Sequence, residues 1–228
     1  MCMEINVGIN GLSKLVHKQI NNHFGISKAE KEIIQNSFKD TIERVRYCFE
    51  RTPNKYYHRD GQTYFNAFHS GQYSIFLYFL SNSVSQKDDK CETLADKIYY
   101  LNKTLNGFDL FHQVRMPDVF FLDHPVGSVI GRADIGNYFS FSQNCTVGNN
   151  KGIYPKIGEN VRMMASSAIL GNCNVGDYVI ISAGTIIKDV DIPPYSLVFG
   201  HPNQLIIKTK DKKYIENLRR PNPEVGQF

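Results

Sequence analysis

Residues 156–188 read KIGENVRMMASSAILGNCNVGDYVIISAGTIIK, and an apolar residue returns at every sixth position of this stretch. The same spacing occurs upstream, before an insertion of four residues. The repeating positions are Ile135, Phe141, Val147, Ile157, Met163, Ile169, Val175, Ile181 and Ile187. Self-similarity at a fixed short period is the signature of a solenoid, in which each unit packs on its neighbours.

A unit of six residues is too short for a pair of helices, so each unit must supply one short strand and one corner. Three sides close a triangular coil of about 18 residues, and coils stack at the strand spacing of roughly 4.8 Å. We expect the apolar residues to point into this prism and Gly or Asn to take corners that need positive φ. An antiparallel β domain fits less well, because its strands alternate with period two. Small or branched residues four positions further on belong to the same repeat: Cys145, Val161, Ser167, Cys173, Val179 and Thr185.

Composition leaves room for one large or two small domains in 228 residues. The net charge of +4 does not call for nucleic acid, although it suits a ligand that carries phosphates. The five cysteines are scattered and lack metal-ligand spacing, so we interpret them as reduced residues, with a catalytic thiol as the minor alternative. No signal-peptide pattern opens the chain, and its longest apolar run, Ile75 to Leu80, cannot cross a bilayer. These features predict a cytoplasmic protein without a membrane span.

The first hundred residues have the periodicity of helices. We expect helices over 12–24, from a capping box at Ser27 to about 49, over 72–82 and over 88–106, with a turn-like segment at 52–66 between them. In the last helix, the inward residues are expected to be Leu94, Ile98, Leu101 and Leu105. The predicted organisation is a helical domain (1–108), the prism (109–202) and a basic tail (203–228). The tail is either a solvated terminus or a contact for ligand phosphates.

The segment 109–202 resembles the serine acetyltransferase branch of the hexapeptide acyltransferases. This resemblance implies an α+β chain, in which a helical N-terminal domain precedes a left-handed parallel β-helix. The stretches that carry it are Phe121-Leu122-Asp123-His124, Gly127-Ser128-Val129-Ile130-Gly131, Asn144-Cys145-Thr146-Val147-Gly148, Tyr154-Pro155-Lys156-Ile157-Gly158, Ala168-Ile169-Leu170-Gly171, Ser182-Ala183-Gly184-Thr185-Ile186-Ile187-Lys188 and Gly200-His201-Pro202.

By the same resemblance, His124 is the general base that removes a proton from the acceptor hydroxyl, and Asp109 is the carboxylate that orients it. The two lie 15 residues apart, close to one coil. A hydroxyl is a poor nucleophile at neutral pH, so an imidazole must take its proton as it attacks a thioester. Asp118 is the alternative carboxylate. His112 and His201 are not expected to be catalytic.

Acyl donors of this branch are coenzyme A thioesters, so acetyl-CoA is the implied co-substrate, with no metal. Small residues on the prism allow the pantetheine amides to reach strand backbone, as an added edge strand would. The donor contacts that the resemblance implies are Gly148, Ala165, Ala183, Gly184, Lys188 and Pro202.

The acceptor side departs from the family pattern. Serine acetyltransferases carry an Arg-His pair before Pro-Lys-Ile that holds the acceptor's carboxylate, whereas this chain has Ile153-Tyr154. Charge-assisted hydrogen bonds contribute about 1.5–3 kcal/mol each, so their loss disfavours serine. The chain also ends in Phe228, whereas the family's partner-docking tail ends in isoleucine. We assign acceptor contacts to Asp123 and Tyr154, whose ring suits a sugar. The leading hypothesis is O-acetylation of a sugar hydroxyl in a surface polysaccharide or its precursor.

Three other functions stay open: a serine O-acetyltransferase of cysteine biosynthesis, an N-acetyltransferase acting on an amino sugar, and a non-catalytic β-helix scaffold. A metal enzyme on the same prism would need several inward histidines, and only His124 qualifies. The expected assembly is a homotrimer or a dimer of trimers, because a loop that projects from one corner needs a neighbour to complete a cleft.

Overall fold

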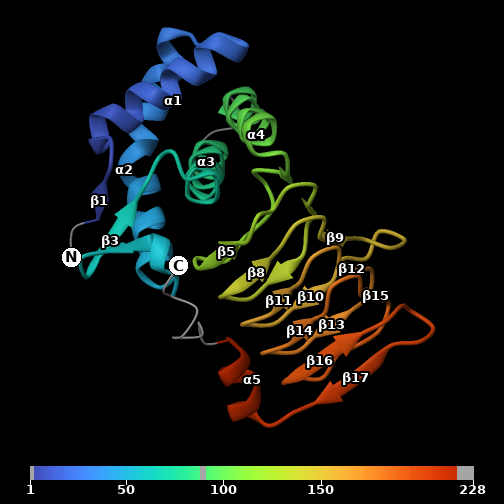
Figure 1. The fold of residues 1–228 in the computed structure, drawn as a ribbon. Coiled ribbons are helices and arrows are strands. Elements are labelled where there is room, and N and C mark those ends of the chain that lie inside the picture. Colours follow the sequence, from blue (N-terminus) through green and yellow to red (C-terminus); the bar gives the residue numbers. More distant parts are fainter. Residues whose placement is uncertain (1–2, 88–90, 220–228) are drawn as a thin grey trace.

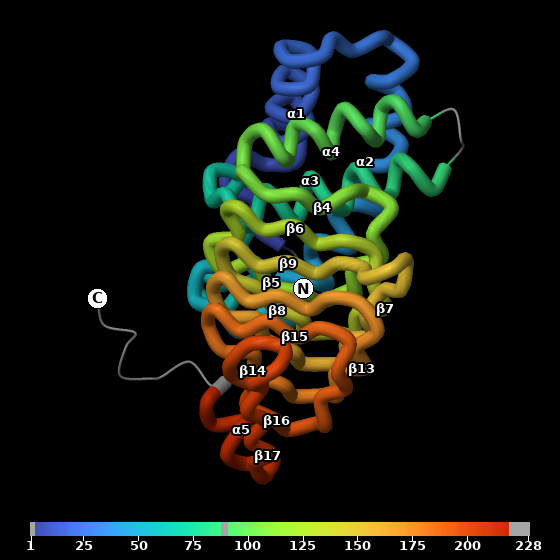
Figure 2. Tube along the Cα trace, turned by 90° about the vertical axis from the view of Figure 1, so that its right-hand side faces the viewer, coloured from blue at the N-terminus to red at the C-terminus, as the bar shows by residue number. Residues whose placement is uncertain are grey.

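The computed structural model describes residues 3–87 and 91–219. Helices of the first hundred residues pack at one end of a stack of parallel coils (Figure 1), and the coils lie directly beneath them when the molecule is turned (Figure 2). The helices are α1 (Gly8–Phe24), α2 (Lys28–Glu50), α3 (Ser70–Ser85), α4 (Glu92–Asn106) and, after the coils, α5 (Lys212–Arg219). None of the helices within the described residues is both long and apolar enough to span a bilayer.

The helix boundaries follow local signals in the sequence. The predicted capping box is confirmed, because the Glu30 N–H donates to Ser27 Oγ at 3.2 Å and the Ser27 N–H donates to Glu30 Oε2 at 2.7 Å. Gly107 ends α4 in the left-handed conformation with φ 66°. Residues 71–84 of α3 are all buried, so α3 is the central helix of this part.

Two expectations about the helical part were wrong. Leu105 is 42% exposed, because it lies in the last turn of α4 where no described element covers it. The segment 52–66 is more than a turn, since it holds the 3-10 helix η1 (Lys55–Tyr57) and the strands β2 (His58–Arg59) and β3 (Gln62–Phe65). β3 lies between β2 and the N-terminal strand β1 (Glu4–Ile5) in a three-stranded sheet. This pairing joins residues about 60 positions apart, which a local pattern cannot reveal.

The coils have three faces, each a sheet of short strands. The β8 face contains β5 (Phe120–Leu122), β8 (Phe139–Phe141), β11 (Arg162–Met163), β14 (Ile180–Ile181), β16 (Ser196–Phe199) and β17 (Ile206–Thr209). The β9 face contains β4 (Asp109–Leu110), β6 (Val129–Ile130), β9 (Thr146–Gly148), β12 (Ala168–Leu170) and β15 (Ile186–Lys188). The β10 face contains β7 (Asp134–Ile135), β10 (Lys156–Ile157) and β13 (Asn174–Val175).

The strand register confirms the solenoid inferred from the six-residue repeat. Each predicted inward residue pairs with the equivalent residue of the next coil, as Phe141 does with Met163 and Met163 with Ile181. All nine are buried except Ile135, which is partly buried. All strand pairs of the coils are parallel except that between β16 and β17. The chain is thus a set of N-terminal helices followed by a left-handed parallel β-helix, as the resemblance implied.

The corners differ from the expectation that Gly or Asn would occupy them. Asn144, Asn160 and Gly184 do have positive φ. Four further corner residues share that backbone region although they are neither Gly nor Asn: Tyr138, Ser166, Tyr178 and Tyr195. Each is held by a backbone hydrogen bond to the preceding coil, such as the 2.8 Å bond from the Tyr178 N–H to the Glu159 carbonyl. The stacked coils therefore impose a conformation that costs an L-residue about 1–2 kcal/mol.

After the last coil the chain turns back, and β17 runs antiparallel to β16. The predicted basic tail, 203–228, thus contains β17 and continues into α5. Residues 220–228, including Phe228, lie outside the described residues. The proposed boundary between residues 108 and 109 falls in the short link between α4 and β4.

Candidate active site

His124 stands at the corner where the chain passes from the β8 face to the β9 face. It follows β5 directly, its side chain is exposed, and its backbone has φ 53°. The preceding Asp123 is partly buried, and its N–H donates to the Phe141 carbonyl at 3.0 Å. A non-glycine residue with positive φ is uncommon, and such strain often occurs at functional sites. The predicted base therefore sits on an edge that both faces can reach.

Several of the predicted donor residues lie on the same corner. Counting two residues beyond the paired Leu122, Phe141, Met163 and Ile181 places one residue of each coil in a single column: His124, Gln143, Ala165 and Ala183. Gly184 follows in this corner, and its N–H donates to the Ala165 carbonyl at 2.9 Å. Ala165, Ala183 and Gly184 are small, so little side-chain bulk covers the backbone on this side of His124, whereas Gln143 has a longer side chain.

The remaining donor residues lie further along the coils. Gly148 and Lys188 both pair with Leu170, at the ends of β9 and β15 on the β9 face. Pro202 lies in the turn between β16 and β17 and is partly buried. The structure thus distributes the predicted donor contacts along one face and its adjoining corner, starting next to the base.

Asp109 lies in β4, and two side chains of α4 bind its carboxylate. It pairs with Val129, and its carboxylate accepts hydrogen bonds from Tyr99 Oη at 2.7 Å and Lys103 Nζ at 2.6 Å. The hydrogen bond that Lys103 donates to Asp109 raises the pKa of Lys103, while burial and then the hydrogen bond to Asp109 raise the pKa of Tyr99. Within residues 3–87 and 91–219 no hydrogen bond joins Asp109 to His124. The pairing of these two residues stays a prediction.

His69 is a neighbour of this corner that the sequence analysis did not identify. Its Nδ1 accepts the Gln72 N–H at 3.3 Å and caps α3. A Cβ on Gly71 would lie 3.4 Å from His69 Cε1 and 3.6 Å from the Leu122 carbonyl oxygen, so the imidazole sits near the end of β5. Burial, and to a lesser extent the charge of His124, lowers the pKa of His69. The neutral ring retains the lone pair that the cap requires. A His-Ser pair before an apolar run signals a helix start, but only the tertiary structure places it beside β5.

A cavity of about 620 Å³ opens on the β8 face next to Asp123. Its floor consists of side chains from β5, β8 and β11 and from the corner before them, and its walls include the segment 52–54 and Glu216 of α5. Polar lining side chains comprise Thr52, Asn54, Asp123, Tyr138, Ser140, Ser142, Asn160, Arg162, Tyr178 and Glu216. Mixed apolar and polar lining of this size is typical of small-molecule sites.

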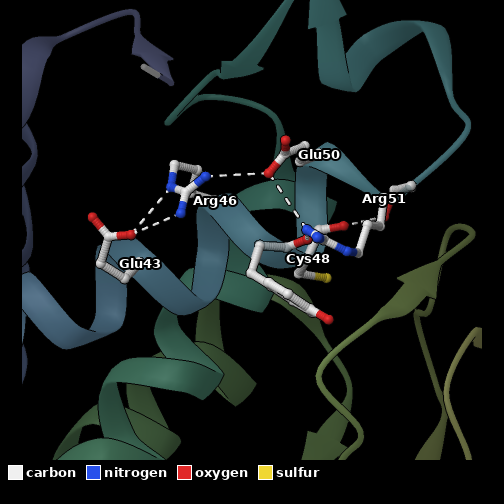
Figure 3. A network of polar contacts seen from close by, with 7 residues as sticks. Glu43, Arg46, Cys48, Glu50 and Arg51 are labelled. Carbon is white, nitrogen blue, oxygen red and sulfur yellow. Dashed lines mark hydrogen bonds and ion pairs between the residues drawn. The ribbon is translucent and has the colours of Figure 1, made fainter. Parts of the chain in front are cut away.

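The wall segment 52–54 follows the last turn of α2, which a polar network stabilises (Figure 3). Arg46 bridges Glu43 and Glu50 at 3.0 and 3.2 Å, and Arg51 reaches Glu50 at 3.4 Å while its guanidinium lies over the Tyr47 ring. Cys48 Sγ donates to the Phe120 carbonyl at 3.4 Å, which ties this turn to β5. The end of α2 is thereby held against the coil that carries Asp123.

Tyr154, the other predicted acceptor residue, is not brought to Asp123 within one chain. It follows the loop closed by the Asn150–Ile153 bridge, between the β9 and β10 faces, and is 37% exposed. Asp123 lies at a different corner and lines the cavity, whereas Tyr154 does not. A shared site would therefore need the loop of a second copy.

Other candidates lie away from the site. His112, which we did not expect to be catalytic, is fully buried, with Nε2 3.0 Å from Asp96 Oδ1. Asp118 precedes β5 and His124 follows it, so the alternative carboxylate lies at the opposite end of that strand. Over the described ranges, no group of three or more His, Cys, Asp or Glu side chains is arranged to hold a metal ion.

Comparison with known proteins supports one family of relatives. No protein-family model matches the chain. The serine acetyltransferase of Bacillus subtilis is 26% identical over 200 residues, which cover 84% of this chain and 88% of the relative. Serine acetyltransferase 2 of Arabidopsis thaliana is 36% identical over 105 residues, but this match covers 44% of the chain and 32% of that relative.

Solved structures of serine acetyltransferases share the fold of this chain. The serine acetyltransferase of Neisseria gonorrhoeae in complex with serine superimposes with a TM-score of 0.65 and 25% identity, covering 89% of this chain and 83% of that one. A serine acetyltransferase in complex with CoA has the same fold, with a TM-score of 0.67 over 88% of this chain and 84% of its own at 21% identity. The fold, the repeat register and these relatives agree: the chain is similar to serine acetyltransferases over most of its length, and its β-helix matches that of a hexapeptide-repeat acyltransferase.

Proposed function

We propose that this protein transfers an acetyl group from acetyl-CoA to the hydroxyl of a small acceptor, and that serine is the leading acceptor. The observation that carries the proposal is the position of His124, on the corner between the cavity next to Asp123 and the small residues Ala165, Ala183 and Gly184. An acceptor in the cavity and a thioester along the small residues would meet at this imidazole.

The chemistry follows from that placement. His124 takes the hydroxyl proton as the oxygen attacks the thioester carbonyl, so that a C–O bond forms. The C–S bond then breaks, and the proton passes from the imidazolium to the departing thiolate. The products are an acetyl ester and free coenzyme A. The donor assignment is supported by a solved relative that holds CoA, and the contacts proposed for it here are Gly148, Ala165, Ala183, Gly184, Lys188 and Pro202.

The choice of acceptor corrects the sequence-based hypothesis. The missing Arg-His pair favoured a sugar of a surface polysaccharide, but the relatives that match over most of the chain are serine acetyltransferases, and one solved relative holds serine. These comparisons favour serine over a sugar. A sugar hydroxyl is the second candidate, because the cavity exceeds the size of serine and is flanked by the rings of Tyr138 and Tyr178.

The acceptor question has a direct test. Purified protein with acetyl-CoA should release free coenzyme A when L-serine is added. A thiol reagent measures this release, and neutral sugars and amino sugars are tested as acceptors in the same way. We expect L-serine to give the highest kcat/KM among these compounds. Turnover with a sugar and none with L-serine would reverse the assignment, and an acetylated amine in the product would indicate N-acetylation.

We also propose that the protein works in the cytoplasm as a homotrimer or as a dimer of trimers. The loop that carries Tyr154 lies at a different corner from Asp123, so a neighbouring copy would have to bring the two together. Light scattering during size-exclusion chromatography should give three times the mass of 26.1 kDa, or a multiple of that trimer. A fully active monomer would show that one chain contains the whole site.

A further inference from the structure

Arg162 is a cation of the acceptor cavity that forms no ion pair with any described residue. It lies on β11, in register with Ser140 of β8 and Ile180 of β14, and it lines the cavity as a half-buried side chain. Among the described residues, none forms a hydrogen bond or an ion pair with its guanidinium. Moving a cation partly out of water without a partner is unfavourable, so its retention in a cavity suggests a ligand.

The acidic residues of the cavity do not neutralise this charge. Glu216, on the wall formed by α5, lies 3.8 Å from Lys212 in an i,i+4 pair. Asp123 lies at the other end of the cavity floor, two residues beyond Phe121 and next to the base. Phe121 pairs with Ser140, and Ser140 pairs with Arg162, so two coil spacings of roughly 4.8 Å separate the backbones of Phe121 and Arg162.

The corner beside Arg162 provides a flat and rigid border. Tyr138, Asn160 and Tyr178 occupy this corner on successive coils, each with φ between 58° and 62°. The Tyr178 ring stacks on Tyr195 with centroids 5.2 Å apart and an angle of 15° between the planes. Tyrosine in this backbone region is costly, and such strain clusters at ligand sites. The rings and Arg162 enclose the end of the cavity distant from His124.

This separation limits the acceptors that reach both ends. In serine, the carboxylate carbon is only three bonds from the hydroxyl oxygen. The base stands three residues past Phe121 along the chain, whereas Arg162 stands two coils away in the perpendicular direction. An acceptor that places a hydroxyl at His124 and an anion at Arg162 must therefore be longer than free serine.

We infer that Arg162, bordered by Tyr138 and Tyr178, is an anion subsite of the acceptor cavity. It takes the carboxylate or phosphate of a hydroxylated acceptor whose acid group lies several bonds from the reacting hydroxyl. This inference rests on the proposed acetyl transfer but not on serine as its acceptor, because it adds a second acceptor class that is acidic and longer than serine. Arginine suits the role, because its planar fork donates two parallel hydrogen bonds to either acid group.

The test compares wild type with Arg162→Gln, and uses Arg132→Gln as the matched control. Arg132 is exposed, donates to Gln113 Oε1 at 3.0 Å and does not line the cavity. Four acceptor probes separate the possibilities: glucose 6-phosphate for phosphate, glucuronate for carboxylate, glucose as the neutral counterpart, and L-serine. Binding of each probe is measured by calorimetry without acetyl-CoA, and turnover is measured with it.

For Arg162→Gln we expect the Kd and the KM of at least one acidic sugar to rise about 10- to 100-fold, because charge-assisted hydrogen bonds are lost. Binding of glucose and the KM for acetyl-CoA should stay unchanged, as should all values for Arg132→Gln. Arg162→Lys should retain part of the affinity for phosphate. Preference for glucose 6-phosphate or for glucuronate identifies the acid group.

Two outcomes would overturn the subsite. One is wild-type binding that does not distinguish the acidic sugars from glucose, and the other is an Arg162→Gln variant that loses affinity for acidic and neutral probes equally. The proposed acetyl transfer has a separate readout. If an acidic sugar binds through Arg162 and no acceptor is acetylated, the subsite holds and the proposed reaction fails. If acetyl transfer to L-serine proceeds and Arg162→Gln changes no binding or kinetic value, the proposed reaction holds and the subsite fails.

Discussion

His124→Ala is expected to lower kcat by about 10²- to 10⁴-fold, the range that a positioned general base contributes. The substitution should leave the fold intact, because the side chain is exposed and forms no hydrogen bond within the described residues. Steady-state kinetics of acetyl transfer, together with the Kd for coenzyme A from calorimetry, check this result. The Kd should change little, since the imidazole acts on the acceptor's proton.

His23→Ala is the matched control. His23 is exposed in the last turn of α1, and its Nδ1 contacts the Gln19 carbonyl at 2.8 Å, remote from the corner that carries His124. Its kcat should equal that of the wild type. A His124→Ala variant that keeps full kcat would remove the base from this mechanism and favour a non-catalytic role for the β-helix.

Asp109→Asn is expected to lower kcat by about 10²-fold if this carboxylate orients His124, because the imidazole would lose the partner that selects its tautomer. The expected loss concerns kcat rather than the KM for either substrate. It requires the Asp109 side chain to leave Tyr99 and Lys103, which bind it in the present structure, and to turn toward the corner when substrates are bound. Kinetics across a pH range provide the measurement, since a misoriented base also shifts the pH profile.

Asp118→Asn serves as the control, because Asp118 is an exposed carboxylate at the opposite end of β5. It should leave kcat unchanged. If Asp109→Asn keeps normal kcat and pH profile but lowers the melting temperature, the carboxylate is a structural anchor for α4. If Asp118→Asn alone impairs turnover, the alternative carboxylate assumes the orienting role.

The acceptor is the point at which the sequence-based hypothesis and the comparisons differ. The hypothesis of a sugar rested on the loss of two donors in the loop at Ile153-Tyr154. Within one chain this loop lies at a corner away from the cavity next to Asp123, so it reaches this cavity only as the loop of a neighbouring copy in the proposed assembly. The residues that define the cavity come instead from α2, the β8 face and α5.

The coiled part of the fold follows from the sequence alone. An inward residue every six positions specifies a strand, a corner and a coil of constant length, so Phe141, Met163 and Ile181 align in one column without any long-range information. The position of His124 at a corner follows in the same way, because it is set by its offset from this repeat. The capping box at Ser27 is equally local.

The tertiary structure decides what surrounds that corner. The cavity joins Thr52, Arg162 and Glu216, whose separations in the chain exceed any repeat, and the packing of α2 and α5 against the coils brings them together. Tertiary contacts likewise bring Tyr99 and Lys103 of α4 to Asp109 and place His69 near β5. Periodicity encodes geometry that repeats from one coil to the next, whereas contacts between elements depend on the burial of whole surfaces, which no short pattern records.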